Sequence, residues 1–165
     1  MKNEMTGALA GWLGDAVAAL AHPVGSVAAE PCSGPALLAM ADRVAAALRE
    51  RDVTPDEPLH LRMGNRPDDI GGLLGVWRAG AVAVPLHAGA APATKERLAA
   101  STKARILVDG RRVERIATDR PPARPLLRGA ALIMFTSGTT GAPKGVVVGH
   151  DRMAAKLGVL DRLLG

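Results

Sequence analysis

Hydrophobic residues recur every three to four positions in several segments of the chain, and short apolar runs separate these segments. The first segment predicts a helix over residues 9–21. A second helix is expected behind Ser33, a suitable N-cap, to about Arg51, with Pro35 in its first turn. Three more helices are predicted, over 65–80, 92–101 and 152–164. The apolar runs predict strands over 59–63, 82–85, 106–108, 130–135 and 146–148.

This alternation of helices and strands extends from residue 8 to residue 109. Helices and strands that alternate at such short intervals favour an α/β fold, with a parallel sheet flanked by helices. Residues 110–129 lack a clear period and are rich in proline and arginine, which predicts a connector. Residues 130–165 contain two apolar runs around a glycine-rich loop, and then the last helix. We therefore expect one partial domain over residues 1–165, composed of these three parts.

The composition is that of a globular chain with few aromatic side chains. Of the 165 residues, 48% are hydrophobic, but one Phe, two Trp and no Tyr are present. A chain of this length buries roughly 70% of its unfolded surface. The core must therefore be built from aliphatic side chains and Met, with many alanines that each remove little area from water.

The net charge of +5 is concentrated between Lys95 and Arg128, where ten basic residues accompany four acidic ones. No aromatic side chain lies in this segment to stack on a base. A solvated linker is therefore favoured over a nucleic-acid site, although a basic surface facing a nucleotide or an acidic partner is also compatible.

The cysteine count and the hydropathy bear on the cellular compartment. Cys32 is the single cysteine, so no disulfide can form within the chain and no thiol cluster can hold a metal. No stretch approaches the ~20 apolar residues that span a bilayer. Polar residues interrupt any apolar core of a signal peptide near the N-terminus. A cytoplasmic protein without a membrane span is the expectation.

The loop after the apolar run 130–135 concentrates groups that bind phosphate. Its sequence, Thr-Ser-Gly-Thr-Thr-Gly-Ala-Pro-Lys-Gly over 136–145, contains three glycines, four hydroxyl side chains and one lysine. Glycines let backbone N–H groups approach an anion, hydroxyls add uncharged donors, and lysine supplies a positive charge. The residue types predict a site for a polyphosphate.

The spacing excludes the two commonest phosphate motifs. In the Walker motif the lysine directly follows the second glycine, whereas here Pro143 stands between Ala142 and Lys144. That motif also begins a helix, whereas residues 146–148 are predicted to form a strand. The dinucleotide pattern Gly-x-Gly-x-x-Gly is absent from this loop as well. The loop is therefore expected to join the two strands of a β-hairpin.

Residues 135–146 resemble the signature of the adenylate-forming (AMP-binding) superfamily, which includes acyl-CoA synthetases, nonribosomal-peptide adenylation domains and luciferases. Upstream, residues 37–48 resemble the first helix of that family. Residues 73–86 resemble its helix–strand element, and 104–108 resemble the strand before its variable connector. The resemblance covers essentially residues 36–150 and corresponds to the N-terminal part of such an enzyme.

The resemblance implies that ATP and a small-molecule carboxylate give an acyl-adenylate and pyrophosphate. An acceptor, often the thiol of coenzyme A and otherwise a carrier protein, then takes the acyl group. By the same resemblance the loop binds the ATP phosphates and the leaving pyrophosphate. The ligands of Mg²⁺ are expected outside this chain. The residues implied in binding ATP and pyrophosphate are Thr136, Ser137, Gly138, Thr139, Thr140, Gly141 and Lys144.

Much of the family's machinery follows the loop in longer members: the acidic magnesium motif, the ribose aspartate, the acyl pocket and the lysine of the mobile C-terminal domain. No catalytic set is complete in this chain, so we expect it to be inactive by itself. Two interpretations stay open. The chain is a portion of an acyl-activating enzyme, or it is a truncated module that binds a nucleotide or a partner without reacting. Its partner would be the remainder of the enzyme or, through an unpaired sheet edge, a second copy.

Thr139 bears on the subfamily, because acyl-CoA synthetases often have Ser-Gly-Thr-Thr-Gly where peptide synthetases usually have Ser-Gly-Ser-Thr-Gly. It favours an acyl-CoA synthetase over the alternative, a nonribosomal-peptide adenylation domain. His150 occupies a position where the family often has a histidine near the acyl and nucleotide sites. An ordinary histidine at a strand end is an equal alternative.

The remaining polar residues predict no further site. The four histidines lack acidic or thiol neighbours at ligand spacing, so no metal site is expected. Asp68 and Asp69 could be paired carboxylates for acid–base chemistry. Their place in the first turn of a helix favours a structural role, because negative charge there complements the helix dipole.

Overall fold

The structure, a computed structural model, describes residues 32–64, 66–136 and 144–164, with side chains to residue 159. The helix predicted over residues 9–21 lies outside this part of the chain. The described helices are α2 (Gly34–Arg49), α3 (Pro67–Arg78), α4 (Pro92–Thr102), the 3₁₀ helix η1 (Pro125–Leu127) and α5 (His150–Leu164). The described strands are β1 (Pro58–Met63), β2 (Val82–His87), β3 (Ile106–Asp109), β4 (Arg112–Arg115), β5 (Ala130–Thr136) and β6 (Lys144–Gly149).

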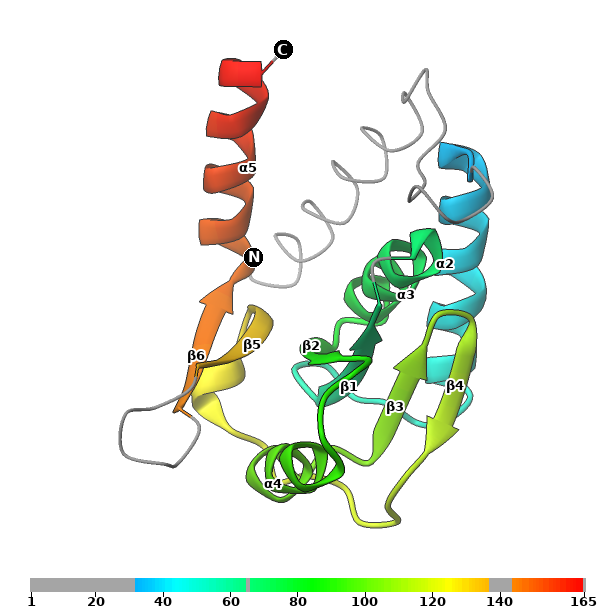
Figure 1. Ribbon diagram of the computed structural model, residues 1–165, viewed down its shortest axis with the longest axis vertical. Coiled ribbons are helices and arrows are strands. Elements are labelled where there is room, and N and C mark those ends of the chain that lie inside the picture. Colours follow the sequence, from blue (N-terminus) through cyan, green and yellow to red (C-terminus); the bar gives the residue numbers. More distant parts are fainter. Residues whose placement is uncertain (1–31, 65, 137–143, 165) are drawn as a thin grey trace.

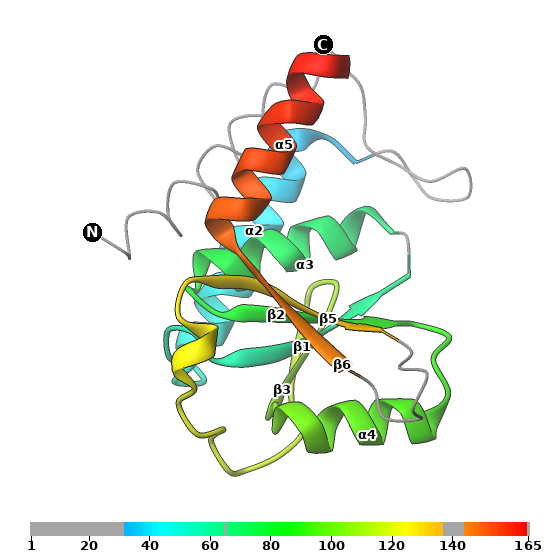
Figure 2. The same cartoon turned by 90° about the vertical axis from the view of Figure 1, so that its left-hand side faces the viewer.

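The six strands form one mixed sheet in the order β4-β3-β1-β2-β5-β6. The four central strands are parallel, as predicted, and β4 and β6 are antiparallel to their neighbours. Helices α2 and α3 lie on one face of the sheet and α4 lies on the other (Figures 1 and 2). The prediction of an α/β sheet flanked by helices is confirmed, and the antiparallel edge strands refine it.

The connector predicted over residues 110–129 is more regular than its sequence suggests. Arg112–Arg115 forms β4, which pairs antiparallel with β3 through a two-residue turn at Gly110 and Arg111. The strand has a single apolar residue, Val113, whose side chain is buried in the core. With one apolar residue among charged ones the strand shows no apolar pattern in the sequence, and it forms because β3 offers an edge with which to pair.

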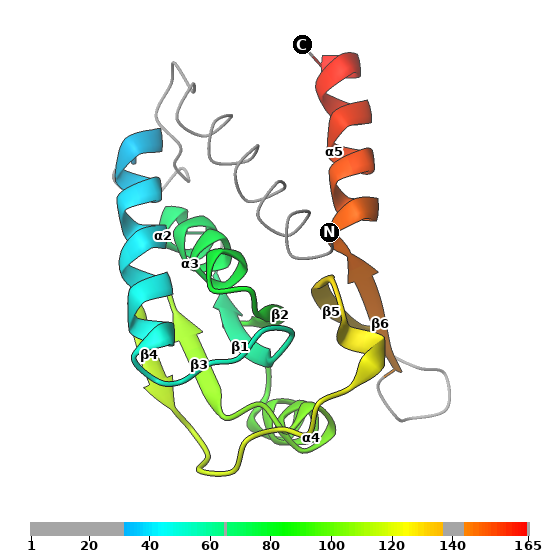
Figure 3. The ribbon, with the colours of Figure 1, turned by 180° about the vertical axis from the view of Figure 1, so that it is seen from behind.

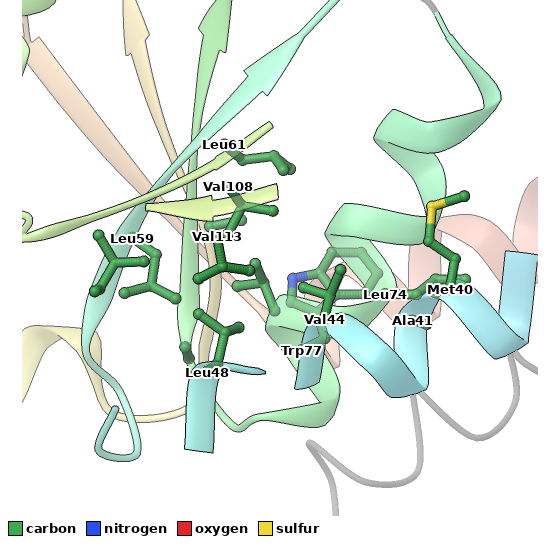
Figure 4. Close-up of a cluster of buried hydrophobic side chains, with 14 of the residues drawn as sticks. Met40, Ala41, Val44, Leu48, Leu59, Leu61, Leu74, Trp77, Val108 and Val113 are labelled. Carbon is green, nitrogen blue, oxygen red and sulfur yellow. The ribbon is translucent and has the colours of Figure 1, made fainter. Parts of the chain in front are cut away.

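The core lies between the sheet and the α2–α3 layer, and it is largely aliphatic, as predicted (Figure 4). Ser33 caps α2 by accepting a hydrogen bond from the Ala36 amide at 3.3 Å. Helices α2 and α3 pack so closely that a Cβ at Gly75 would lie 2.6 Å from Val44 Cβ. The backbone of α3 therefore approaches α2 at a position that only glycine tolerates.

The hairpin of β5 and β6 stands at one side of the sheet, and α5 projects beyond it (Figure 3). The two strands pair from Ala130 opposite Gly149 to Thr136 opposite Lys144. Among the described residues β6 pairs with β5 alone, so it forms an edge of the sheet. None of the described helices has the length and apolar character needed to cross a bilayer.

Candidate functional site

The ends of the predicted phosphate loop are held by the last residues of β5 and the first of β6. Thr136 and Lys144 face each other across the hairpin, and the Thr136 hydroxyl donates to the Lys144 carbonyl at 3.5 Å. Both side chains are exposed. The Lys144 side chain is therefore accessible to an anion from solvent.

The interior of the loop, residues 137–143, lies outside the described part of the chain. The roles predicted for Ser137, Gly138, Thr139, Thr140 and Gly141 therefore remain predictions. The hairpin itself is described on both sides of the loop, and it joins two antiparallel strands as expected.

His150 lies at the opposite end of the hairpin from these two residues. It is the first residue of α5, directly after β6, and only 3% of its surface is exposed. The six residues of β6 separate it from the start of that strand by roughly 20 Å at about 3.3 Å per residue. The described geometry does not bring His150 together with Thr136 and Lys144, and its role near an acyl group or a nucleotide remains a prediction.

The imidazole of His150 is buried against Trp77 (ring centroids 5.5 Å apart, edge to face). Among the described residues neither of its ring nitrogens has a hydrogen-bond partner. Burial lowers the pKa of His150, and the negative charges of Asp56 and Asp151 oppose that shift only in part. The ring is therefore expected to be neutral near pH 7.

Asp68 and Asp69 begin α3, and their environments support the structural role. Asp69 is 1% exposed, and its carboxylate accepts from the Gly64 amide at 2.6 Å and the Arg66 amide at 2.9 Å. Asp68 lies 3.5 Å from Arg111 at the surface. Asp69 therefore closes the turn before α3 and is not free to act as an acid or a base.

A network of charged side chains lies at the carboxyl ends of β1 and β3, and the sequence patterns did not reveal it. Asp109 accepts from Arg62 at 3.0 Å and from Arg66 at 2.6 Å, and Arg66 also binds Asp69. Burial raises the pKa of Asp109, but the two arginines lower it more, so that the net shift is downward. The hydrogen bond to Asp109 is the largest cause of the raised pKa of Arg66. The sequence could have indicated this network, because Arg62 and Asp109 lie at the carboxyl ends of two predicted strands. The carboxyl ends of adjacent parallel strands meet at one edge of the sheet.

Part of the basic segment has structural partners. Arg120 and Arg124 donate to the carbonyls of Asp52 and Ser101, at 2.7 and 3.1 Å. Together with Arg128 they border a hollow of about 420 Å³ beside the start of β1, and its lining includes five prolines. These hydrogen bonds fix the path of the connector along the surface. The connector therefore has a structural role in addition to its positive charge.

A second hollow, of about 330 Å³, lies between the sheet and α4, and His60 is part of its wall. His60 is 2% exposed and lies 3.0 Å from the Thr102 hydroxyl. The threonine hydroxyl donates to the Leu98 carbonyl at 2.8 Å, so His60 Nε2–H donates to the threonine. Burial lowers the pKa of His60 to about 4.

Metal ligands are not assembled in the described residues. No three His, Cys, Asp or Glu side chains among them come close enough to hold an ion. The expectation that the ligands of Mg²⁺ lie outside this chain stays a prediction.

Comparison with protein families gives a match over most of the chain. The model of the family described as "AMP-binding enzyme" matches residues 30–128 and 111–163. Pyochelin synthetase PchE of Pseudomonas aeruginosa is 30% identical over 135 residues, which cover 74% of this chain and 9% of PchE. A plipastatin synthase of Bacillus subtilis is 32% identical over 132 residues, which cover 69% of this chain and 4% of that protein. The chain thus spans less than a tenth of the length of these relatives.

Solved structures with the same fold are more distant in sequence. VinN in complex with L-aspartate gives a TM-score of 0.72 at 18% identity, over 97% of this chain and 52% of VinN. Apo MatB of Rhodopseudomonas palustris gives 0.67 at 18% identity, over 94% of this chain and 36% of MatB. The N-terminal subdomain of Klebsiella oxytoca NpsA gives 0.61 at 18% identity, over 90% of this chain and 40% of that subdomain chain. At these identities the likeness establishes the fold.

Proposed function

This chain belongs to the AMP-binding enzyme family, and we propose that it is the N-terminal part of an ATP-dependent enzyme that activates a carboxylate. The carrying observation is the hairpin that presents Thr136 and Lys144, exposed and paired, at the two ends of a glycine-rich loop. The proposed role of this part is to hold the phosphates of ATP while the remainder of the enzyme supplies the acyl pocket.

In the proposed reaction, a carboxylate oxygen forms a bond to the α-phosphorus of ATP. The bond from that phosphorus to the oxygen bridging to the β-phosphate breaks, and pyrophosphate leaves with the electron pair. Negative charge develops on the leaving oxygens, and the Lys144 ammonium and loop hydroxyls and amides would stabilise it. Such catalysis depends on positioned donors and charge, which residues 136–144 supply by type.

Members of this family use ATP and Mg²⁺. We assign no step in this chain to the ion. The acceptor of the acyl group is proposed to be a thiol. Thr139 supports coenzyme A, whereas matched peptide synthetases, such as Salinispora arenicola CymA (32% identical over 128 residues), support the adenylation-domain alternative.

Lys144→Ala tests the proposed phosphate site. We expect the affinity of the chain for pyrophosphate to fall about tenfold to a hundredfold, because a charge-assisted contact is lost. The free energy of unfolding should change by less than about 0.5 kcal/mol, because the lysine is exposed. Calorimetric titration of pyrophosphate and a denaturation curve measure the two quantities. Lys156→Ala removes an equally exposed lysine from α5 and should leave the affinity unchanged. Equal affinities for wild type and Lys144→Ala would contradict the assignment of Lys144.

The edge of β6 that has no neighbouring strand among the described residues is the proposed contact with another chain segment. Val146 in this strand is 51% exposed, and Met134 in β5 is 52% exposed. An apolar edge strand with free backbone groups is a template for further pairing. When the 165-residue chain is produced by itself, we expect a second copy to occupy this edge, with a mass in light scattering that rises with concentration. Val146→Lys should reduce the association, and a wild type that stays monomeric at all concentrations would contradict this role of β6.

A further inference from the structure

The hairpin that carries the proposed phosphate site is joined to the rest of the sheet near its base. Strand β5 pairs with β6 along its whole length but with β2 at one register position, Leu132 opposite Ala83. Beyond that position Ile133 is buried with Val82 and Val84 of β2, and Phe135 and Val147 pack against the same cluster, while Met134 is half exposed. The direction of the hairpin therefore depends on this cluster and on the hydrogen bonds at its base.

Trp77 of α3 contacts β5 and the residue that follows β6 at that base. The indole is 3% exposed, and its Nε1–H donates to the Ala131 carbonyl of β5 at 2.9 Å. The edge-to-face contact with His150 joins the same ring to the residue that follows β6. The Trp77 side chain thus connects α3 to the beginning of β5 and to the residue directly after the end of β6.

Ala131 is also where the β5–β6 register shifts, between the pairs Ala130–Gly149 and Leu132–Val148. A residue at such a bulge has no opposite residue in the partner strand, and the bulge increases the local twist. The indole hydrogen bond is therefore made at the residue where the direction of the hairpin is set. Two further bonds stabilise the base, from the His150 amide to Gly129 O (3.1 Å) and from the Gly129 amide to Asp56 Oδ1 (2.9 Å).

Distance amplifies small changes at this base. Five residues of strand separate Ala131 from Thr136, which is roughly 17 Å at about 3.3 Å per residue. A rotation of about 5° at the base would thus move the far end by roughly 1.5 Å, by the same strand length. Misplacement of about 1 Å is enough to weaken a catalytic or binding arrangement.

We propose that Trp77 is a positioning residue for the phosphate loop: it fixes the direction of the β5–β6 hairpin through its N–H bond to Ala131 and its contact with His150. The first part of this inference, anchoring, depends only on the described contacts. The second part, the effect on phosphate affinity, rests on the function proposed for the loop.

Two substitutions at position 77 test the proposal. Trp77→Phe keeps a buried ring and removes the N–H donor. The second substitution, for use if Trp77→Phe does not fold, places 3-benzothienylalanine at position 77. This residue replaces the indole N–H with sulfur and keeps the shape of the ring system, so it tests the loss of the donor alone. Leu48→Val is the control, since it trims a fully buried side chain in α2 and loses no polar contact.

Hydrogen–deuterium exchange reports the anchoring without any ligand. Loss of the N–H donor should make the amides of β5 and β6 exchange about threefold to tenfold faster, a change of the size of one hydrogen bond, while those of α2 and β1 change less. Leu48→Val should accelerate exchange without singling out the hairpin. Equal acceleration of the hairpin and the rest of the sheet in the position-77 variants would overturn the proposal.

Titration with pyrophosphate reports the positioning. We expect affinity to fall about threefold to tenfold in the position-77 variants and to stay unchanged in Leu48→Val. Faster hairpin exchange with unchanged affinity would overturn the positioning role. If wild type and Lys144→Ala bind pyrophosphate equally, the function proposed for Lys144 fails, while the exchange data still decide whether Trp77 anchors the hairpin.

Discussion

Glu57→Ala is expected to lower the free energy of unfolding by about 3–5 kcal/mol, because it leaves a buried guanidinium without its counter-charge. Arg105 is 2% exposed and Glu57 is 4% exposed. The arginine donates to the two carboxylate oxygens at 2.8 and 3.3 Å. Among the described residues, the other hydrogen bonds of the Arg105 side chain go to the carbonyls of Arg51 and Asp52, which carry no formal charge.

The substitution has a second consequence, because Glu57 also orders the turn before β1. Its carboxylate accepts from the amide and the hydroxyl of Thr54, each at 3.1 Å. Loss of the side chain therefore leaves three groups to find water or a new partner, two on half-buried Thr54 and one on buried Arg105. Stability is measured by urea denaturation, followed by circular dichroism and by tryptophan fluorescence.

Glu114→Ala is the matched control, because it removes a carboxylate paired with Arg112 at the surface. The arginine side chain is 78% exposed, so this change should cost no more than about 1 kcal/mol. If Glu57→Ala lowers the free energy of unfolding by as little as Glu114→Ala, the buried Glu57–Arg105 pair does not stabilise the packing of this turn against the start of β3. Should Glu57→Ala fail to fold, Glu57→Gln provides the measurement, since it removes the charge and keeps an acceptor for Thr54.

The free energy of unfolding is expected to decrease as the pH falls from 6.5 toward 4, with His60 as the main cause. The folded chain holds this ring neutral, with a pKa lowered by burial to about 4, while an unfolded histidine titrates near 6.5. Between these values the unfolded state binds more protons than the folded state. The contribution of His60 is therefore complete above pH 6.5 and is lost as the pH approaches 4.

One pKa unit corresponds to about 1.4 kcal/mol, so the largest contribution of His60 is about 3 kcal/mol. His150, whose pKa burial also lowers, changes stability in the same direction. Asp109 has a lowered pKa, so its contribution is lost at lower pH, after its unfolded pKa has been reached. The window from 6.5 to 4 therefore reports mainly on the two buried histidines.

His60→Gln should remove most of this pH dependence, because glutamine can donate to Thr102 in place of Nε2 and does not titrate. His87→Gln changes an exposed histidine and should leave the slope as it is in wild type. Urea denaturation at half-unit steps of pH between 7 and 4 measures the effect. A slope that persists unchanged in His60→Gln would show that His60 is not its cause.

Most of the secondary structure and the family could be predicted from the order of residues along the chain. Ser33 predicts the start of α2 because a cap needs only the amides of the next turn. The apolar residues predict β1, β2, β3, β5 and β6, since each of these strands contains at least three of them. The residues of the 136–145 loop are contiguous, so their types and order identify the phosphate-loop motif without knowledge of the fold.

Contacts between residues far apart in the chain became visible only in the folded molecule. Glu57 meets Arg105, and Trp77 meets Ala131, because β1, β3 and β5 lie where the sheet order places them. Strand β4 forms on the edge that β3 offers, although its own residues show no pattern. The burial of His150 beside Trp77 likewise follows from how the hairpin packs on α3. A cap, a period or a motif is encoded by neighbours in the chain, whereas these contacts depend on which faces and edges meet when the chain folds.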